Sequence, residues 1–169
     1  MVRKIAVVGS CCFTTIFIVL VLTHFAGGFN SFWPNWVRSG TEYERRLGVF
    51  DAVFKESGGI VFLGDSLTYA GPWSELFPKS QTHNFGIDGD TSSGLLQRIQ
   101  TISMRRPSKV FLMIGTNDLS LEFSEGSILE NILETTNQIK LVSPETEIFV
   151  QSVLPRGPKY RERIESLNK

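Results

Sequence analysis

The stretch Ile60-Val-Phe-Leu-Gly-Asp-Ser-Leu67 decides the fold, because four apolar residues run directly into a polar turn. A short apolar run of β-forming residues between glycines is typical of a strand that is buried on both faces. Comparable runs occur at 109–114, before Gly115, and at 147–154, before Pro155. A weaker strand is predicted at 82–85. These runs together predict a sheet whose central strands are covered on both sides.

Helices are predicted between these strands. Apolar residues at helical spacing indicate one helix from Tyr43 to about Ser57, one over 91–104, and one that ends at Ser143-Pro144. Strands that alternate with helices of this length form βαβ units, in which the sheet is parallel. The sequence therefore predicts an α/β fold, namely a flavodoxin-like three-layer α/β/α sandwich. In such sheets, ligands bind beyond the carboxyl ends of the strands.

Three polar clusters follow the first three predicted strands, and we expect them to meet at one edge of the sheet. They are Gly64-Asp-Ser-Leu67, Asn84-Phe-Gly-Ile-Asp-Gly-Asp-Thr91 and Gly115-Thr-Asn-Asp118. Ser66 would present its hydroxyl at a strand-to-helix turn, where backbone N–H groups are unpaired. Gly89 would bring a backbone N–H close to a ligand, and Asn117 would add an amide donor. Together they offer a nucleophile and three donors for an oxyanion.

Each cluster also has an ordinary structural explanation. A lone Gly-Asp-Ser is typical of a turn in which the serine caps a helix, and Asn-Asp after a strand is common in turns. Asp65 and Asp118 are expected to fix loops rather than to take protons. The occurrence of all three clusters in order, each after a strand, favours a site at Ser66, Gly89 and Asn117.

The same residues resemble the conserved blocks of the GDSL, or SGNH, hydrolases. Residues 60–68 resemble the first block, 84–91 the second and 115–118 the third, and the stretch 153–163 is similar to the region before the last helix in bacterial members akin to platelet-activating-factor acetylhydrolase. The resemblance implies a serine ester hydrolase, an esterase or lipase that works through an acyl-enzyme. It implies Ser66 as nucleophile and Gly89 and Asn117 as oxyanion donors, with no metal or other cofactor.

The fourth block of that family, Asp-x-x-His, is missing. Asp118 is the last aspartate of the sequence and no histidine follows His83, so the general base and its orienting acid are absent. A serine hydroxyl is a weak nucleophile without an adjacent base. His83 is interpreted as a strand histidine rather than a substitute base. Activity is therefore expected to be impaired, and a non-catalytic binding domain of the same fold is the alternative.

A flavin- or phosphate-binding flavodoxin-like module is a further alternative, but the loop after the first strand is too short and acidic for it. The sequence also stops within a predicted helix, 159–169, whereas the family fold continues through another strand and helix. We therefore expect the hydrolase domain, residues 38–169, to be incomplete, to leave the strand at 147–154 as an open edge, and to fold marginally.

The N-terminus carries an uncharged segment from Ile5 to Leu22, preceded by Arg3 and Lys4. A run of this length is close to the ~20 residues that cross a bilayer, and the flanking positive charges keep the N-terminus cytoplasmic. We predict a signal-anchor helix over 1–26 and a linker over 27–37. The domain would then lie on the outer, periplasmic side of the inner membrane. The alternative is secretion after signal cleavage.

Charge and composition restrict the partners. The chain has 17 basic and 17 acidic residues among 169, which gives no basic patch for nucleic acid. Its length suits one domain. The expected partners are a small-molecule, lipid or glycan ester substrate and, through the N-terminal segment, the membrane. The sequence does not indicate an oligomeric state.

Overall fold

A computed structural model describes residues 41–53 and 57–169. The predicted signal-anchor over 1–26 and the linker over 27–37 lie outside these residues. Within the described ranges, each helix is too short or too polar to cross a bilayer.

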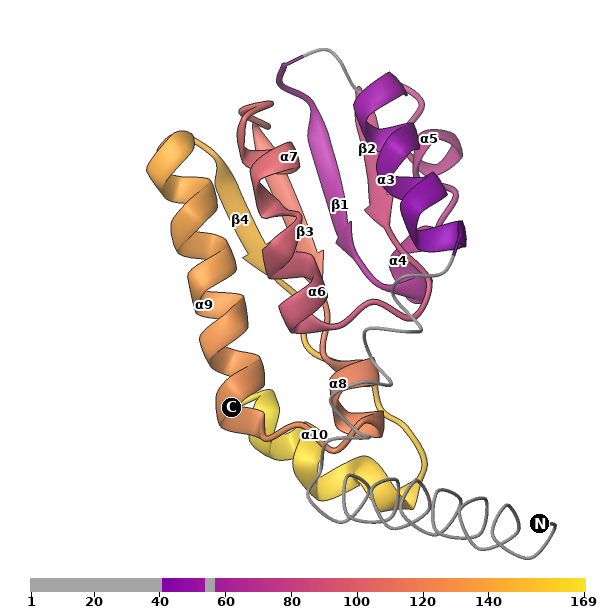
Figure 1. Ribbon diagram of the computed structural model, residues 1–169, viewed down its shortest axis with the longest axis vertical. Coiled ribbons are helices and arrows are strands. Elements are labelled where there is room, and N and C mark those ends of the chain that lie inside the picture. Colours follow the sequence, from indigo (N-terminus) through magenta and orange to yellow (C-terminus); the bar gives the residue numbers. More distant parts are fainter. Residues whose placement is uncertain (1–40, 54–56) are drawn as a thin grey trace, which may run out of the picture. The chain divides into compact units, whose positions relative to one another are not determined.

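The centre of the fold is a parallel sheet in the order β2-β1-β3-β4 (Figure 1). The strands are β1 (Ile60–Gly64), β2 (Thr82–Gly86), β3 (Lys109–Met113) and β4 (Glu147–Val150). The predicted parallel α/β sheet is thus confirmed, with β4 at one edge. The prediction for β4 was too long, because pairing ends with Val150 opposite Leu112. Beyond that point β3 gives way to Gly115 and a helix, so the rest of 147–154 has no strand to pair with.

The helices alternate with the strands, as expected, but several are shorter than the periodicity predicted. The bounds are α3 (Thr41–Val53), α4 (Ser66–Tyr69), α5 (Trp73–Leu76), α6 (Ser92–Gln97), α7 (Ile99–Ser103), α8 (Thr116–Ser120), α9 (Glu125–Val142), the 3-10 turn η1 (Pro158–Tyr160) and α10 (Arg161–Leu167). The single helix predicted over 91–104 is divided at Arg98 into α6 and α7. The helix start expected at Ser66 is confirmed by α4. Helices α5 and α8 were not predicted, since one turn is too short to show a helical period.

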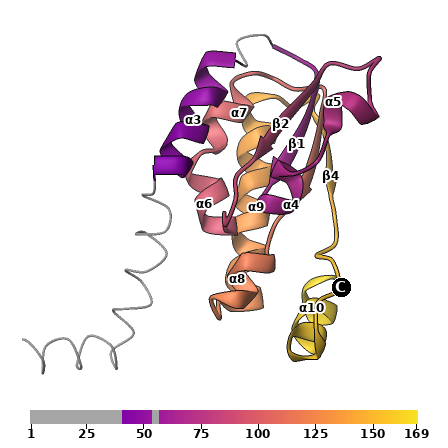
Figure 2. The ribbon, with the colours of Figure 1, turned by 90° about the vertical axis from the view of Figure 1, so that its right-hand side faces the viewer.

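Most of the core lies between the sheet and the helices α3, α6, α7 and α9, which Figure 2 shows on one side of the strands. On that side β1 and β3 supply the fully buried side chains Val61, Leu63, Val110 and Leu112. Phe50 of α3 packs on Phe85 of β2, with ring centroids 4.5 Å apart. This apolar layer fixes the strand ends from which the polar loops emerge.

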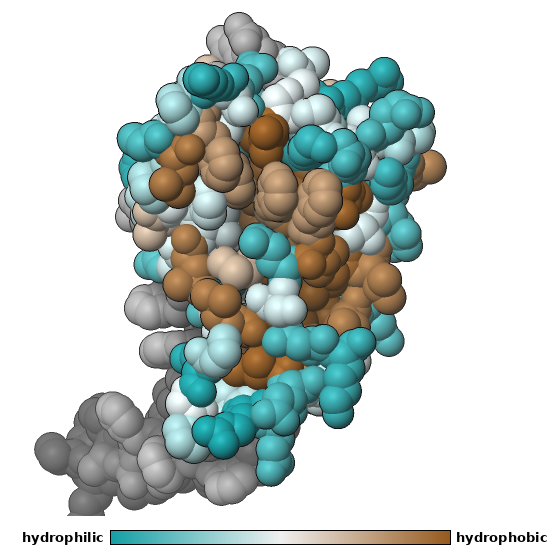
Figure 3. All heavy atoms as spheres, turned by 180° about the vertical axis from the view of Figure 1, so that it is seen from behind, coloured by the Kyte–Doolittle hydropathy of each residue, from teal (hydrophilic) through white to brown (hydrophobic). Residues whose placement is uncertain are grey.

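The opposite face of the sheet carries a row of aromatic side chains. Phe62, Phe111 and Phe149 lie in register on three neighbouring strands, with centroid separations of 5.3 Å and 4.9 Å. Trp73 of α5 covers Phe62 at 3.9 Å, but Phe149 on the edge strand is 42% exposed. Figure 3 views this face and shows apolar residues gathered across its middle. Helices therefore cover this face beside β1 and leave it open towards β4.

Gly64 and Gly86 pair across β1 and β2, and both allow α4 to sit close to the strand ends. A Cβ on Gly64 would lie 2.2 Å from the Met113 carbonyl oxygen and 2.3 Å from the Thr68 hydroxyl. A Cβ on Gly86 would lie 2.2 Å from the Tyr69 backbone nitrogen. These glycines are required because at each of them a backbone atom occupies the space that a Cβ would need.

Gly64→Ala is expected to lower the free energy of unfolding by about 2–3 kcal/mol, since the added methyl must displace α4 or β3. The matched control is Gly126→Ala in the first turn of α9, where the nearest atom to an added Cβ is 4.0 Å away. That change should be neutral or stabilise by up to about 1 kcal/mol. Urea unfolding of both variants checks this, and equal effects at the two positions would contradict the close approach.

Candidate active site

Ser66 is the first residue of α4, directly after the turn that follows β1. Asp65 caps this helix by accepting a hydrogen bond of 3.0 Å from the Leu67 N–H. Among the described residues, neither the N–H nor the hydroxyl of Ser66 has a hydrogen-bond partner. Ser66 is only half-buried. The residue thus offers a hydroxyl and an unpaired N–H from the same position.

A pocket of about 340 Å³ opens beside Ser66. Its lining also includes Asn117 from α8 and the segment Leu154-Pro-Arg156 that follows β4. The structure therefore brings together two of the three site residues predicted from sequence, which lie 51 positions apart. Gly89 is not among the residues that line this pocket.

The loop that holds Gly89 is nevertheless tied to Asn117. The Asn117 side-chain amide donates a hydrogen bond of 2.8 Å to the carbonyl oxygen of Asp90, the residue after Gly89. An amide nitrogen has two hydrogens, so one remains for another acceptor. Gly89 has φ +71°, a conformation suited to glycine, and its N–H has no partner in the described part of the chain.

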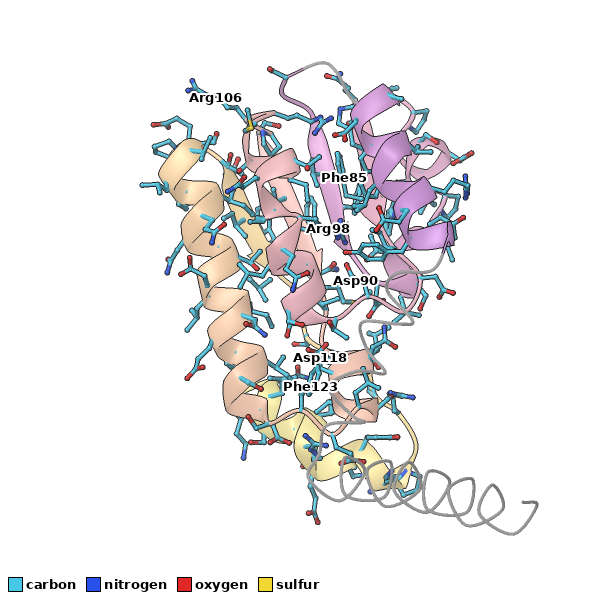
Figure 4. All side chains as sticks on the ribbon, in the orientation of Figure 1. Phe85, Asp90, Arg98, Arg106, Asp118 and Phe123 are labelled. Atoms are coloured by element: carbon cyan, nitrogen blue, oxygen red, sulfur yellow. The ribbon has the colours of Figure 1, made fainter. Side chains whose placement is uncertain are left out.

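Arg98, at the break between α6 and α7, fixes this loop from inside the protein. Its Nε donates to the Asp90 carboxylate at 2.8 Å, and both groups are buried. Its two terminal nitrogens donate to the carbonyl oxygens of Phe85 at 2.9 Å and Gly64 at 3.1 Å. Figure 4 shows Arg98 between Phe85 and Asp90. One guanidinium therefore joins the ends of β1 and β2 to the loop of Gly89.

Asp118 holds the start of α6 to the start of α8. Its carboxylate accepts hydrogen bonds from the Ser92 N–H, at 3.0 Å to each oxygen, and from the Ser92 hydroxyl at 2.5 Å. The Asn131 amide of α9 donates to the same hydroxyl at 3.0 Å. Asp118 is fully buried, so these donors replace the water that it loses.

Each of the three loops thus carries one buried aspartate, and their proximity has electrostatic consequences. Burial raises the pKa of Asp65 to about 6; the Leu67 N–H opposes the rise, and the charges of Asp90 and Asp118 add to it. Burial also raises the pKa of Asp118, against the hydrogen bonds from Ser92. The described residues contain no cluster of three potential metal ligands.

His83 does not lie near Ser66. It belongs to β2 opposite Val61, and its imidazole lies against Gly59, since a Cβ on that glycine would be 2.9 Å from Nε2. Gly59 precedes β1, whereas Ser66 follows it. A strand of five residues spans roughly 16 Å at ~3.3 Å per residue. The histidine is therefore at the far end of the strand from the nucleophile.

A family model for GDSL-like lipases and acylhydrolases matches residues 62–169. The chain belongs to this family. Platelet-activating factor acetylhydrolase IB subunit alpha1 of Rattus norvegicus is 34% identical over 106 residues, covering 58% of this chain and 44% of that protein. The alpha2 subunit of Homo sapiens is 31% identical over 117 residues, covering 66% and 50%.

A solved structure agrees with the family assignment. The crystal structure of a GDSL-like lipase from Bacteroides thetaiotaomicron is 27% identical, with a TM-score of 0.60 over 75% of this chain and 69% of that one. The chain spans about half the length of the curated relatives that it matches. The comparisons thus establish the family and the GDSL/SGNH-type fold of the matched part.

Sequence reasoning missed the groups that hold the site residues in place. Arg98 was not identified, although it lies three residues after Leu95 on the buried side of the predicted helix. A charged residue on the buried side of a helix indicates a buried ion pair, because charges inside a protein are generally paired. Ser92 and Asn131 gave no signal, since their partners are 26 and 39 residues away.

Asp65→Asn is expected to change the pH dependence of stability. Because the pKa of Asp65 is raised to about 6 in the folded state, the folded protein binds more protons than the unfolded one between about pH 4 and pH 6. The contribution of the Asp65 carboxyl group to the free energy of unfolding is therefore fully present below pH 4 and is lost as the pH rises to about 6. The stability of D65N relative to the wild type should therefore increase by about 1–3 kcal/mol from pH 4 to pH 7.

Urea unfolding at both pH values measures this difference. Asp88→Asn, at an exposed position of the loop before Gly89, controls for loss of one negative charge. A constant difference between D65N and wild type across the range would contradict the raised pKa.

Proposed function

We propose that the chain is the nucleophile-bearing part of a carboxylic ester hydrolase that forms an acyl-enzyme on Ser66. The observation that carries the proposal is the pocket shared by Ser66 and Asn117, with the Ser66 N–H unpaired in the described residues. Membership of the GDSL-like lipase and acylhydrolase family supports it. No metal or organic cofactor enters the proposed reaction.

In the proposed first step, the Ser66 hydroxyl oxygen attacks the acyl carbon while a base takes its proton. The carbonyl oxygen becomes an oxyanion, which accepts hydrogen bonds from the N–H groups of Ser66 and Gly89 and from the free amide hydrogen of Asn117. As the carbonyl re-forms, the protonated base returns the proton to the departing alkoxide, so that the alcohol leaves and an ester remains on Ser66. Water then attacks this ester and releases the acid.

The base is the missing part. The sequence of 169 residues has two histidines, one in the N-terminal apolar region and one at position 83. His83 packs beside Gly59, at the other end of β1 from Ser66. The proposal uses neither histidine as the base. We therefore propose that this chain acylates slowly. Short acyl esters, acetylated sugars and lysophospholipids all suit the family, and the named relatives are acetylhydrolases of platelet-activating factor.

A non-catalytic binding domain is the second candidate, and the distance between His83 and Ser66 favours it. Such a domain would keep the pocket and the oxyanion donors but would not be acylated. An oxyanion hole alone retains part of a triad enzyme's rate enhancement, so weak turnover does not separate the two candidates. Formation of a covalent ester on Ser66 does.

Hydrolysis of p-nitrophenyl acetate should be slow for the wild-type chain, and added imidazole should increase it by supplying the missing base. Imidazole also cleaves this ester directly, so the increase is measured after subtracting that of Ser66→Ala. Asn117→Ala should lower the Ser66-dependent increase by about tenfold to a hundredfold, because one oxyanion donor is lost.

Mass spectrometry of the quenched reaction should find the acetyl group on Ser66. Identical rates for wild type and S66A, with no acetylated serine, would leave the binding domain as the function. Rapid Ser66-dependent turnover without imidazole would show that another base operates.

For the location we propose a single-pass signal-anchor over 1–26, with the N-terminus cytoplasmic and the hydrolase domain on the outer side of the inner membrane. The support is the uncharged segment Ile5–Leu22 after Arg3 and Lys4. The full chain in spheroplasts should remain with the membrane in carbonate and be degraded by external protease. Recovery of a shortened chain in the soluble periplasmic fraction would instead show secretion after cleavage.

A further inference from the structure

Arg156 lies in the segment after β4 and lines the pocket beside Ser66. It is the only charged residue among the described residues that line this pocket, the others being Leu67, Thr116, Asn117, Leu154, Pro155 and Ser66 itself. The three buried aspartates do not line the pocket, and each accepts a hydrogen bond from a donor of its own. The pocket wall therefore presents one positive charge to whatever enters.

The guanidinium of Arg156 is held in place on one side. Nη1 donates to the Thr116 carbonyl oxygen at 2.9 Å and to the Ser120 hydroxyl at 2.7 Å. The Tyr160 ring lies against the guanidinium, with its centroid 4.5 Å from Cζ. Because Thr116 precedes Asn117, these contacts fix the charge relative to an oxyanion donor. An arginine held in this way loses less conformational entropy when it binds a ligand.

The remaining donors of Arg156 are unused. All its hydrogen bonds in the described residues come from Nη1, which leaves the hydrogens on Nε and Nη2 without acceptors. These two nitrogens form the fork that binds carboxylate or phosphate oxygens in a bidentate manner. Arg98 shows the contrast, since it uses Nε and both terminal nitrogens within the protein.

We propose that Arg156 forms an anion subsite, so that the preferred substrates are esters that carry a carboxylate or phosphate group beside the reacting acyl bond. That the ligand is an ester rests on the proposed esterase function. That Arg156 binds an anion does not depend on catalysis and can be tested by binding alone. It selects among the ester classes that the family allows: anionic esters are bound more tightly than neutral esters of the same shape.

The test is an NMR titration of the chain with two matched pairs of alkyl esters. Monoethyl succinate and its neutral amide, ethyl succinamate, report on a carboxylate, and 2-acetoxyethyl phosphate and 2-acetoxyethanol report on a phosphate. At low salt, at least one anionic ester should bind about fivefold more tightly than its neutral partner, a difference that shrinks as salt screens the charge. The pair with the larger difference identifies the anion.

Arg156→Gln should abolish the preference, while Arg161→Gln, at an exposed position of α10, should retain it. If R156Q does not fold, the wild-type Arg156 Nε–H resonance decides, because a hydrogen bond to an anion should shift it more than the neutral partner does. Equal binding of both members of each pair overturns the subsite, as does absence of binding by every anionic ester. So does a preference that survives in R156Q, or an Arg156 resonance that does not move.

The outcome is separate from that of the esterase proposal. Ser66-dependent cleavage of p-nitrophenyl acetate uses a neutral ester and needs no anion subsite. Loss of that cleavage with an intact Arg156-dependent preference would refute the hydrolase alone. Ser66-dependent acylation with equal binding of anionic and neutral esters would refute the subsite alone.

Discussion

A single buried arginine determines whether the strand ends can form a site. Arg98 places a positive charge among the carboxyl ends of β1 and β2, and it binds the carbonyl oxygens of Gly64 and Phe85 together with the carboxylate of Asp90. An isolated charge at this depth would cost several kcal/mol, so the arginine and the aspartate are stable there only as a hydrogen-bonded pair. The loop of Gly89 is the part of the chain that this pairing orients.

The same requirement recurs in the other two loops. Asp65 and Asp118 are buried, and each accepts hydrogen bonds from the beginning of a helix rather than from water. Asn117 then joins the loops after β2 and β3 through the Asp90 carbonyl. The N–H groups of Ser66 and Gly89 have no partner in the described residues, whereas the three buried aspartates all accept hydrogen bonds. This contrast is typical of a site prepared for a developing negative charge.

The sequence predicted the parts of this arrangement that depend on local pattern. Strand β1 was predictable because its apolar run is bounded by glycine, and Ser66 and Asn117 were expected to meet because loops after parallel strands share one edge. The division at Arg98 was not predictable, since the apolar spacing on both sides of it is that of one continuous helix. Strand β4 ends at Val150 because β3 turns away there. The apolar run at 147–154 continues past this point and therefore does not indicate where the strand ends. Likewise, hydrogen bonds such as Asn131 to Ser92 exist only once distant elements have packed.

The two walls of the pocket follow strands that have different numbers of neighbours in the sheet. Ser66 and Asn117 follow the inner strands β1 and β3, whereas the wall formed by Leu154-Pro-Arg156 follows the edge strand β4, which is paired on one side only. Edge elements with few buried contacts open locally at lower free energy than the strands they flank, and their amides exchange hydrogen sooner. The backbone of β4 is therefore expected to open before that of β1 and β3, which carry Ser66 and Asn117 at their ends. The proposed anion subsite on this wall therefore depends on the contacts of Arg156 with Thr116, Ser120 and Tyr160, which hold its guanidinium beside an edge strand.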